Sequence, residues 1–260
     1  MKPVATRLTD QHRASVVQDL RRLLPALEEM PGEMPALPFG LPAIDGHLHR
    51  GGLVCGALHE IVPESEGDAA AALGFAIALT SLLPAQGPVL FVASPNGLAG
   101  HGKVHGHGFN SLGLDPARVT LVEAAEDRQA CWAMEEALRS AVPAVVLGAI
   151  EGLDLRASQR LQLAAAEAGR PLLLTRPADI LGSSVAVTRW RIRAAAAACD
   201  RFGLIARWRW GVQLERCRNG RPGEWFVEYD HAAHRFSLAA TLAHSSIHEG
   251  TGQSVLRQAG

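Results

Sequence analysis

A loop in the first third of the chain has the length of a phosphate-binding loop but lacks its key side chains. In the pattern Gly-x-x-x-x-Gly-Lys-Ser/Thr, the lysine contacts nucleotide phosphates and the hydroxyl contacts Mg²⁺. Here only the second glycine, Gly67, is kept, because Asp68 replaces the lysine and Ala69 replaces the hydroxyl residue. The segment reads Val62, Pro63, Glu64, Ser65, Glu66, Gly67, Asp68, Ala69.

The lysine replacement changes the sign of the electrostatic interaction with phosphate. A lysine about 4 Å from a phosphate oxygen contributes roughly 4 kcal/mol at an effective dielectric constant near 20, and an aspartate there is repulsive instead. We therefore expect conventional Mg-ATP binding to fail. We interpret the loop as a vestige of an ATPase site, although a simple tight turn between a strand and a helix would have the same sequence.

An ATPase of this type also needs an aspartate after an apolar strand, to hold Mg²⁺. The best match, Val145 to Leu147, is followed by Gly148. Glu151 and Asp154 come slightly later, where we interpret them as loop charges. With both the loop lysine and this aspartate replaced, we expect a protein that is not an enzyme and has no cofactor.

The stretch from Gly97 to Gly108 contains His101, Lys103, His105 and His107. Closely spaced imidazoles can bind a transition metal, but no cysteine or carboxylate close in sequence completes a set of four ligands. We expect a glycine-rich loop and no metal site. The cysteines are scattered, with no Cys-x-x-Cys spacing, and are expected to be buried small hydrophobic residues rather than disulfide partners. They are Cys55, Cys131, Cys199 and Cys217.

Arginines alternate with tryptophans in the last third of the chain. Residues two apart in a strand share a face, so the arginines would project on one side while Trp190 and Trp210 point to the other. This arrangement predicts a surface that holds single-stranded DNA through its phosphates. The alternative is a solvated face whose arginines pair with carboxylates elsewhere or with a partner protein. The candidate DNA contacts are Arg189, Arg191, Arg193, Arg207 and Arg209.

The elements that must position these groups alternate between strands and helices. A strand over 56–62 leads through the loop into an apolar helix, and helices are expected over 126–140 and 156–168. Strands alternating with helices of this length indicate parallel βαβ units with right-handed crossovers. We therefore predict an α/β fold with a mainly parallel sheet flanked by helices. Four further apolar runs predict buried strands: Pro88–Ala93, Val119–Val122, Ala144–Leu147 and Pro171–Thr175.

The pattern changes after Arg176 to short alternating runs separated by turn residues, which predict antiparallel strands that extend one edge of the sheet. These strands are expected over 185–193, 204–209, 212–218, 225–229 and 235–238.

We divide the chain into an N-terminal helix with a proline-rich linker over 1–37, a core over 38–240 and a disordered tail over 241–260. The N-terminal helix has one apolar face, which packs either on its own domain or on another chain. The apolar positions are Val16, Val17, Leu20, Leu23, Leu24 and Leu27.

Composition limits the class of protein. The chain has 260 residues, 48% of them hydrophobic, and a formal net charge of −1. These values are typical of a globular protein with a substantial core. No secretory signal pattern or apolar run of transmembrane length is present. We expect a soluble cytoplasmic protein with no membrane partner.

Two groups of segments resemble known families. The run Phe39 to Asp45, followed by Gly51-Gly52-Leu53-x-x-Gly56 and Glu60-Ile61, resembles the start of the RecA/RadA recombinase core. The region from about 38 to 238 is similar to the ImuA family of RecA-like proteins, also labelled SulA-like. The segments that carry this second resemblance are Glu135–Arg139, Ser158–Ala165, Thr188–Ile192, Arg218–Trp225 and Glu228–Ala232.

The resemblance implies a RecA-like core and a role in the response to DNA damage. The family acts in SOS-induced translesion synthesis, with an ImuB-type Y-family polymerase homologue and a DnaE-type error-prone polymerase as partners, and contact with RecA is a further implication. We therefore expect a non-catalytic adaptor. Two alternatives stay open: an ATP-binding, DNA-dependent ATPase that uses a residue such as Lys103, and a SulA-like inhibitor of cell division.

Overall fold

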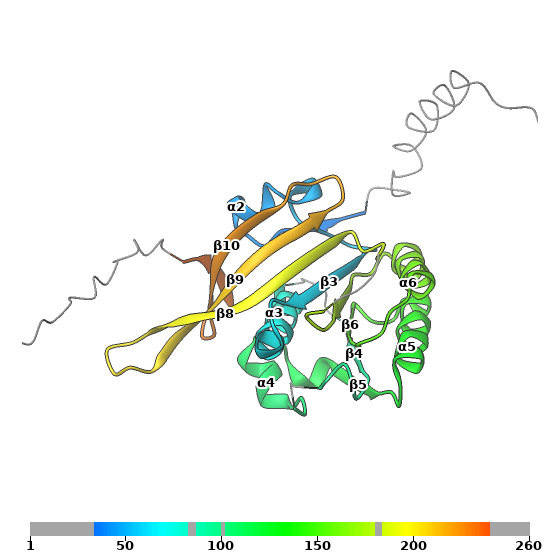
Figure 1. Cartoon of the computed structure of the whole chain (residues 1–260), viewed down its shortest axis with the longest axis horizontal. Coiled ribbons are helices and arrows are strands. Elements are labelled where there is room, and N and C mark those ends of the chain that lie inside the picture. Colours follow the sequence, from blue (N-terminus) through cyan, green and yellow to red (C-terminus); the bar gives the residue numbers. More distant parts are fainter. Residues whose placement is uncertain (1–33, 83–86, 100–101, 180–183, 240–260) are drawn as a thin grey trace, which may run out of the picture.

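The computed structural model describes residues 34–82, 87–99, 102–179 and 184–239 (Figure 1). The predicted N-terminal helix and the predicted disordered tail both lie outside these residues. Within the part of the chain that is described, no helix is long and apolar enough to cross a bilayer.

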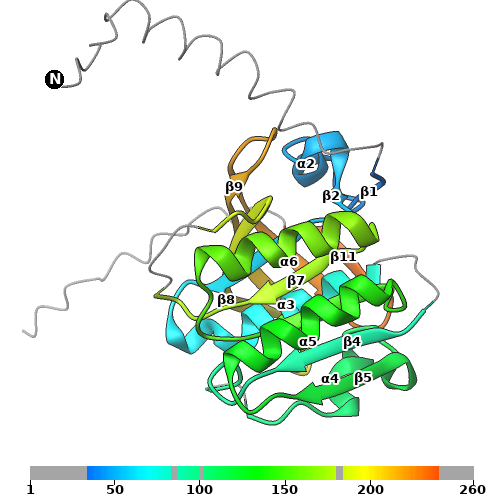
Figure 2. The same cartoon turned by 90° about the vertical axis from the view of Figure 1, so that its right-hand side faces the viewer.

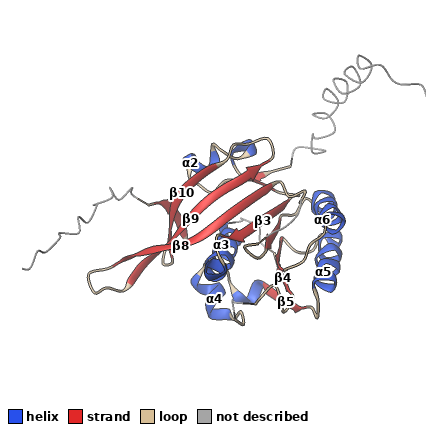
Figure 3. Cartoon of the chain, viewed as in Figure 1, coloured by secondary structure: helices blue, strands red, loops and turns tan. Residues whose placement is uncertain are grey.

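A nine-stranded mixed sheet organises the described residues (Figure 3). Its parallel part consists of β8, β3, β7, β6, β4 and β5, and its antiparallel part adds β9, β10 and β11 beyond β8. The predicted α/β architecture, with a largely parallel sheet and C-terminal antiparallel strands, is confirmed. The order across the sheet is β11 (Arg235–Leu238), β10 (Gly223–Asp230), β9 (Ile205–Cys217), β8 (Thr188–Cys199), β3 (Leu58–Pro63), β7 (Leu172–Thr175), β6 (Val145–Ala149), β4 (Val89–Ala93), β5 (Val119–Glu123).

Helices cover both faces of the parallel part, because its central strands are apolar on both sides. Helix α3 (Ala69–Leu82) lies on one face together with the short α4 (Gly106–Ser111), while α5 (Asp127–Ser140) and α6 (Leu155–Ala168) lie side by side on the other (Figure 2). One core cluster joins α3 to the tryptophans Trp190 and Trp210. A second cluster joins the stripe of Cys131, Met134 and Leu138 on α5 to α6 and the sheet.

Strand β8 connects the two parts of the sheet. It pairs with β3 in parallel on one side and with β9 in antiparallel on the other. Beyond the end of β3, the β8 and β9 strands continue as a hairpin that projects away from the helices (Figure 1).

The predicted strands over 204–209 and 212–218 are one strand, β9, which is a correction to the sequence interpretation. Gly211 does not interrupt it, because the Arg193 side chain of β8 packs over this glycine. A Cβ atom at Gly211 would lie 2.5 Å from Arg193 Nε.

The proline-rich stretch contributes to the domain instead of forming only a linker. The strand β1 (Ala36–Leu37) pairs with β2 (Leu53–Val54), ahead of the short helix α2 (Pro42–Asp45). Phe39 is buried, and its ring centroid lies 5.3 Å from that of Trp190. The described domain therefore begins before residue 38.

Two smaller expectations are also corrected. Part of the glycine-rich region expected as a loop is the helix α4, which starts at Gly106. Cys55 and Cys131 are buried as predicted, but Cys199 is exposed and Cys217 is half-buried. Cys199 is exposed because it lies in the part of the β8–β9 hairpin that extends beyond β3.

Candidate functional site

The loops that follow four parallel strands meet at one edge of the sheet and enclose a cavity of about 340 Å³. Ligands of open α/β sheets bind at this carboxyl edge, where an ATPase would hold its nucleotide. The sequence-predicted vestigial loop contributes three of the lining residues: Pro63, Glu66 and Ala69. The other lining residues follow β4, β6 and β7: Asn96, Gly97, Ala99, Glu151, Thr175, Arg176, Pro177 and Ala178.

The carboxylate of Asp68, in the lysine position of the loop, is bound by the protein itself. Asp68 Oδ2 accepts hydrogen bonds from the backbone N–H of Ser65 at 3.1 Å and from its hydroxyl at 2.6 Å. Asp68 Oδ1 accepts another from the backbone N–H of Ala194 on β8, at 2.8 Å. Partial burial raises the pKa of Asp68, but these hydrogen bonds and nearby Arg193 outweigh it and lower the pKa overall. The loop therefore supplies its own anion.

The start of the loop is also bound to β8. The backbone N–H of Glu64 donates to the carbonyl oxygen of Ile192 at 2.8 Å. Ser65 and Asp68 form a reciprocal capping box around the 3₁₀ turn 66–68 that precedes α3. Because Asp68 already occupies one backbone donor of the loop, that donor does not face a ligand.

The strand that should carry the Mg²⁺ aspartate has no room for it at Gly148. A Cβ atom at Gly148 would lie 2.6 Å from Leu174 Cδ1 and even closer to Met134 Sδ. The strand β6 also continues to Ala149 instead of ending at Leu147, as the sequence had suggested. The acid that lines the cavity beyond this strand is the exposed Glu151.

A buried charge network lies directly behind the cavity. Glu60 of β3 is fully buried, and its carboxylate lies 3.4 Å from Arg176 Nη1 and 2.7 Å from Arg189 Nη2. Arg176, a cavity-lining residue, also donates to the carbonyl oxygen of Glu151 at 3.1 Å. Burial lowers the pKa of Arg176, while the negative charge of Glu60 opposes this effect. Sequence analysis missed this network, although a glutamate within an apolar strand was its signal.

The five candidate DNA-contact arginines project from β8 and β9, on the side of the sheet away from α3. Each of them has a carboxylate partner. The pairs are Arg189 with Glu60, Arg191 with Glu215, Arg193 with Glu64 and Glu224, Arg207 with Glu228 and Asp230, and Arg209 with Glu228.

The five arginines differ in exposure. The side chains of Arg189 and Arg209 are 18% and 15% exposed, whereas those of Arg193 and Arg207 are 36% and 49% exposed. Hydrogen bonds from Arg209 and Arg207 lower the pKa of the Glu228 carboxyl, although its partial burial acts in the opposite direction. Arg193 also packs 4.7 Å from the centroid of the exposed Phe226 ring. Arg193 and Arg207 are therefore the most accessible candidates for a phosphate contact.

Trp190 and Trp210 lie on the face opposite the arginines, as predicted, and are core residues that are 0% and 5% exposed. The described residues contain no group of three or more histidine, cysteine, aspartate or glutamate side chains that could hold a metal ion. His105 and His107 have ring centroids 6.0 Å apart. Lys103, the group named for an unorthodox ATPase, is exposed and does not line the cavity.

Comparison with known proteins gives two close matches. No family model matches the chain. Two curated proteins from Caulobacter vibrioides, one from strain NA1000 and one from strain CB 15, are each described as Protein ImuA. Each is 34% identical over 232 residues, which cover 82% of this chain and 92% of the relative.

Proposed function

Because the chain belongs to the ImuA family, we propose that it is a non-catalytic, RecA-like accessory factor of SOS-induced error-prone translesion synthesis. In this proposal it acts as an adaptor in the cytoplasm. It holds an ImuB-type Y-family polymerase homologue and a DnaE-type polymerase together at damaged DNA, and contacts RecA.

One observation carries the non-catalytic part of this proposal: the Asp68 carboxylate occupies the loop that would otherwise bind phosphate. A bound triphosphate would find the backbone donor of Ser65 already taken and would face Glu66 and Glu151 at the cavity. The negative charges of the phosphates and of these carboxylates would repel one another, and this repulsion is strongest where water is excluded. The closely packed Gly148 adds a second obstacle, because it leaves no space for a Mg²⁺ ligand on β6.

The RecA-like part of the proposal is supported by the position of the loop. It follows a strand inside the sheet, at the carboxyl edge, and it leads directly into the largely buried helix α3. This strand, loop and helix unit is the arrangement of a nucleotide-binding domain, here without the side chains that bind the nucleotide.

Two measurements on the full chain test the proposal. Isothermal titration calorimetry with Mg-ATP is expected to give no binding heat at micromolar affinity. A pull-down with the ImuB-type homologue from the same genome is expected to retain the chain. Micromolar Mg-ATP binding that is lost in Lys103→Ala would support the ATPase alternative, and failure of the pull-down would contradict the adaptor role.

Single-stranded DNA remains a proposed partner through Arg193 and Arg207, the most exposed of the five arginines. The partners of Arg193, Glu64 and Glu224, are exposed, and exposed ion pairs of this kind contribute only about 0–1 kcal/mol. Arg207 pairs with the buried Glu228 and the partly exposed Asp230, but its own side chain is 49% exposed. A phosphate can therefore compete for these guanidinium groups. None of the described residues favours the alternative function, inhibition of cell division.

A further inference from the structure

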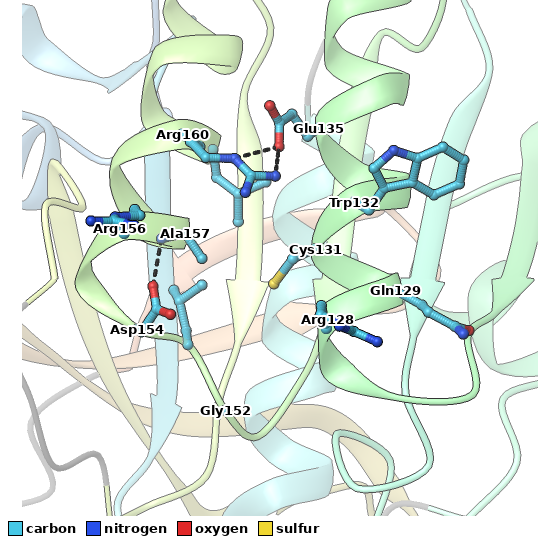
Figure 4. Close-up of a pocket in the computed structure, with 12 residues that line it drawn as sticks. Arg128, Gln129, Cys131, Trp132, Glu135, Gly152, Asp154, Arg156, Ala157 and Arg160 are labelled. Carbon is cyan, nitrogen blue, oxygen red and sulfur yellow. Dashed lines mark hydrogen bonds and ion pairs between the residues drawn. The ribbon is translucent and has the colours of Figure 1, made fainter.

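A second and larger cavity, of about 720 Å³, lies between the N-terminal halves of α5 and α6 (Figure 4). Its floor contains Cys131 from α5 with Ala157 and Leu161 from α6, and Leu153 lines it from the preceding loop. The ion pair between Glu135 and Arg160 joins the two helices and closes one end (Figure 4). We refer to this cavity as the α5–α6 groove.

The α5–α6 groove has the chemistry of a surface that binds another helix. Trp132 at its edge is 61% exposed, an unusual position for so large an apolar side chain. Arg128, Arg156 and Asp154, together with the Glu135–Arg160 ion pair, place charges of both signs around the apolar floor. An amphipathic helix buries its apolar residues in such a groove and places polar residues at the rim.

A catalytic use of the groove is not supported by its cysteine. Burial and the nearby Asp127 raise the pKa of the Cys131 thiol to about 11. The thiol therefore stays protonated at neutral pH, and it is the thiolate that acts as a nucleophile. The groove is a packing surface.

The described chain begins next to the helix layer that forms this groove. Met34 packs against Val54, Ala57 and Val187, and its carbonyl oxygen accepts a hydrogen bond from Arg50 at 3.3 Å. A Cβ atom at Gly169, the C-cap of α6, would lie 3.5 Å from Met34 Cε. The preceding residues therefore join the domain at the C-terminal end of α6.

The length and pattern of the preceding sequence fit the groove. Pro25 is expected to end a helix that begins at Asp10 at about Leu24. An α-helix over 10–24 would be about 22 Å long, and α6 with its 14 residues is about 21 Å long. A helix that ends near the C-terminal end of α6 would thus reach back along the full length of α5 and α6. Five apolar residues in this segment fall at helical spacing: Val16, Val17, Leu20, Leu23 and Leu24.

We infer that residues 10–24 of the same chain occupy the α5–α6 groove as an amphipathic helix, with Leu20 and Leu24 toward its floor. This inference is independent of the proposed function. The sequence left open whether this segment packs on its own domain or on another chain, and the inference chooses its own domain. The short connection from Pro25 to Glu33 keeps the segment at a high effective concentration near the groove.

Cross-linking in the full chain tests the position. The chain carries Cys199→Ser to remove the exposed thiol, together with Leu20→Cys and Trp132→Cys. A short bis-maleimide is expected to join the two introduced cysteines within one monomer. The matched control combines Leu20→Cys with Phe202→Cys, at the 71% exposed hairpin tip, and is expected not to cross-link.

Hydrogen exchange gives a second readout that does not depend on the introduced cysteines. Leu20→Ser with Leu24→Ser is expected to speed amide exchange several-fold in α5 and α6, because the groove loses its cover. Arg22→Ser, on the opposite face of the predicted helix, is expected to leave exchange unchanged. Cross-links only between two chains, or exchange in α5 and α6 that does not respond to the leucine substitutions, would overturn the inference.

Discussion

Glu60 on β3 and Arg189 on β8 form an ion pair, with 2.7 Å between the carboxylate oxygen and the guanidinium nitrogen, and no part of the Glu60 side chain is exposed. The same carboxylate neutralises Arg176, whose side chain is 7% exposed. One acid therefore compensates two buried bases at the boundary between the parallel and antiparallel parts of the sheet.

Removal of this acid should be costly. We expect Glu60→Gln to lower the free energy of unfolding by about 3–5 kcal/mol, because two guanidinium groups would remain buried without a counter-charge. Urea denaturation followed by circular dichroism measures the change. Glu64→Gln is the matched control, since Glu64 is 51% exposed and pairs with Arg193 at the surface, and it should cost under about 1 kcal/mol. Equal costs for the two variants would contradict this account.

Asp68 should be a structural residue that cannot be converted into a phosphate ligand by simple replacement. Asp68→Ala is expected to lower the free energy of unfolding by about 1–2 kcal/mol, because the capping interactions are lost. Asp68→Lys with Ala69→Ser restores the sequence of the phosphate-binding pattern but is expected to show no Mg-ATP binding in calorimetry. Nucleotide binding by this double variant would show that Glu66, Glu151 and Gly148 are not sufficient obstacles.

His59 should make the stability of the protein depend on pH. Its Nδ1 lies 2.8 Å from Thr188 Oγ1 and its Nε2 lies 2.9 Å from the Val54 carbonyl oxygen. Complete burial lowers the pKa of His59 from 6.5 to about 4. The unfolded chain therefore binds a proton first as the pH falls, so the stabilising contribution is complete above pH 6.5 and is lost between pH 6.5 and pH 4.

Between pH 6.5 and pH 4, the contribution of His59 to the free energy of unfolding is expected to fall by about 3 kcal/mol. Urea unfolding at several pH values measures it, and His59→Gln should remove most of the slope whatever its effect on stability at neutral pH. His47→Gln, at a half-buried histidine, is the control and should retain the pH dependence. A slope that survives His59→Gln would assign the effect to another group.

The arginine surface makes a separate prediction about DNA. Replacement of Arg191, Arg193 and Arg207 by glutamine is expected to weaken binding to single-stranded oligonucleotides and to reduce the salt dependence of the binding constant by roughly one unit per lost phosphate contact. Fluorescence anisotropy at several salt concentrations gives both values. Arg139→Gln on α5 is the control, because it removes a charge from a different surface. An unchanged slope would remove these arginines from the DNA-contact surface.

Gly148 should tolerate no side chain. We expect Gly148→Ala to lower the free energy of unfolding by about 1–3 kcal/mol, because its Cβ would overlap Met134 and Leu174. Gly108→Ala in α4 is the control, since nothing lies within 4 Å of a Cβ atom there, and alanine is favoured over glycine in a helix by about 0.5–1 kcal/mol. Thermal unfolding of the two variants should therefore shift in opposite directions.

The strands and helices of the parallel part could be predicted from sequence, because each buried apolar run has a distinct period. The helix over 126–140 and the stripe of Cys131, Met134 and Leu138 on it were recovered almost to the residue. The alanine run 194–198 was not recognised as strand, because alanine has little intrinsic preference for it. Its conformation comes from pairing with β9, which a local pattern does not contain.

The candidate site was predicted less completely. The loss of the lysine and hydroxyl residues could be read directly at Asp68 and Ala69. The partners that give Asp68 its role could not, because Ala194 lies 126 residues away in sequence. The partners of the arginine surface could not be predicted for the same reason. Few acids lie close in sequence to these arginines, and the carboxylates that pair with them come from other segments: Glu60, Glu64, Glu224 and Glu228.

The pairing of β3 with β8 has a consequence for synthesis on the ribosome. His59 on β3 and Thr188 on β8 are 129 residues apart, and β7, the other neighbour of β3, is also translated long after it. At bacterial translation rates β3 therefore waits on the order of ten seconds for either flanking strand. During that interval its apolar edges are open to chaperones, and a prematurely terminated chain that ends before β8 would be a substrate for proteases.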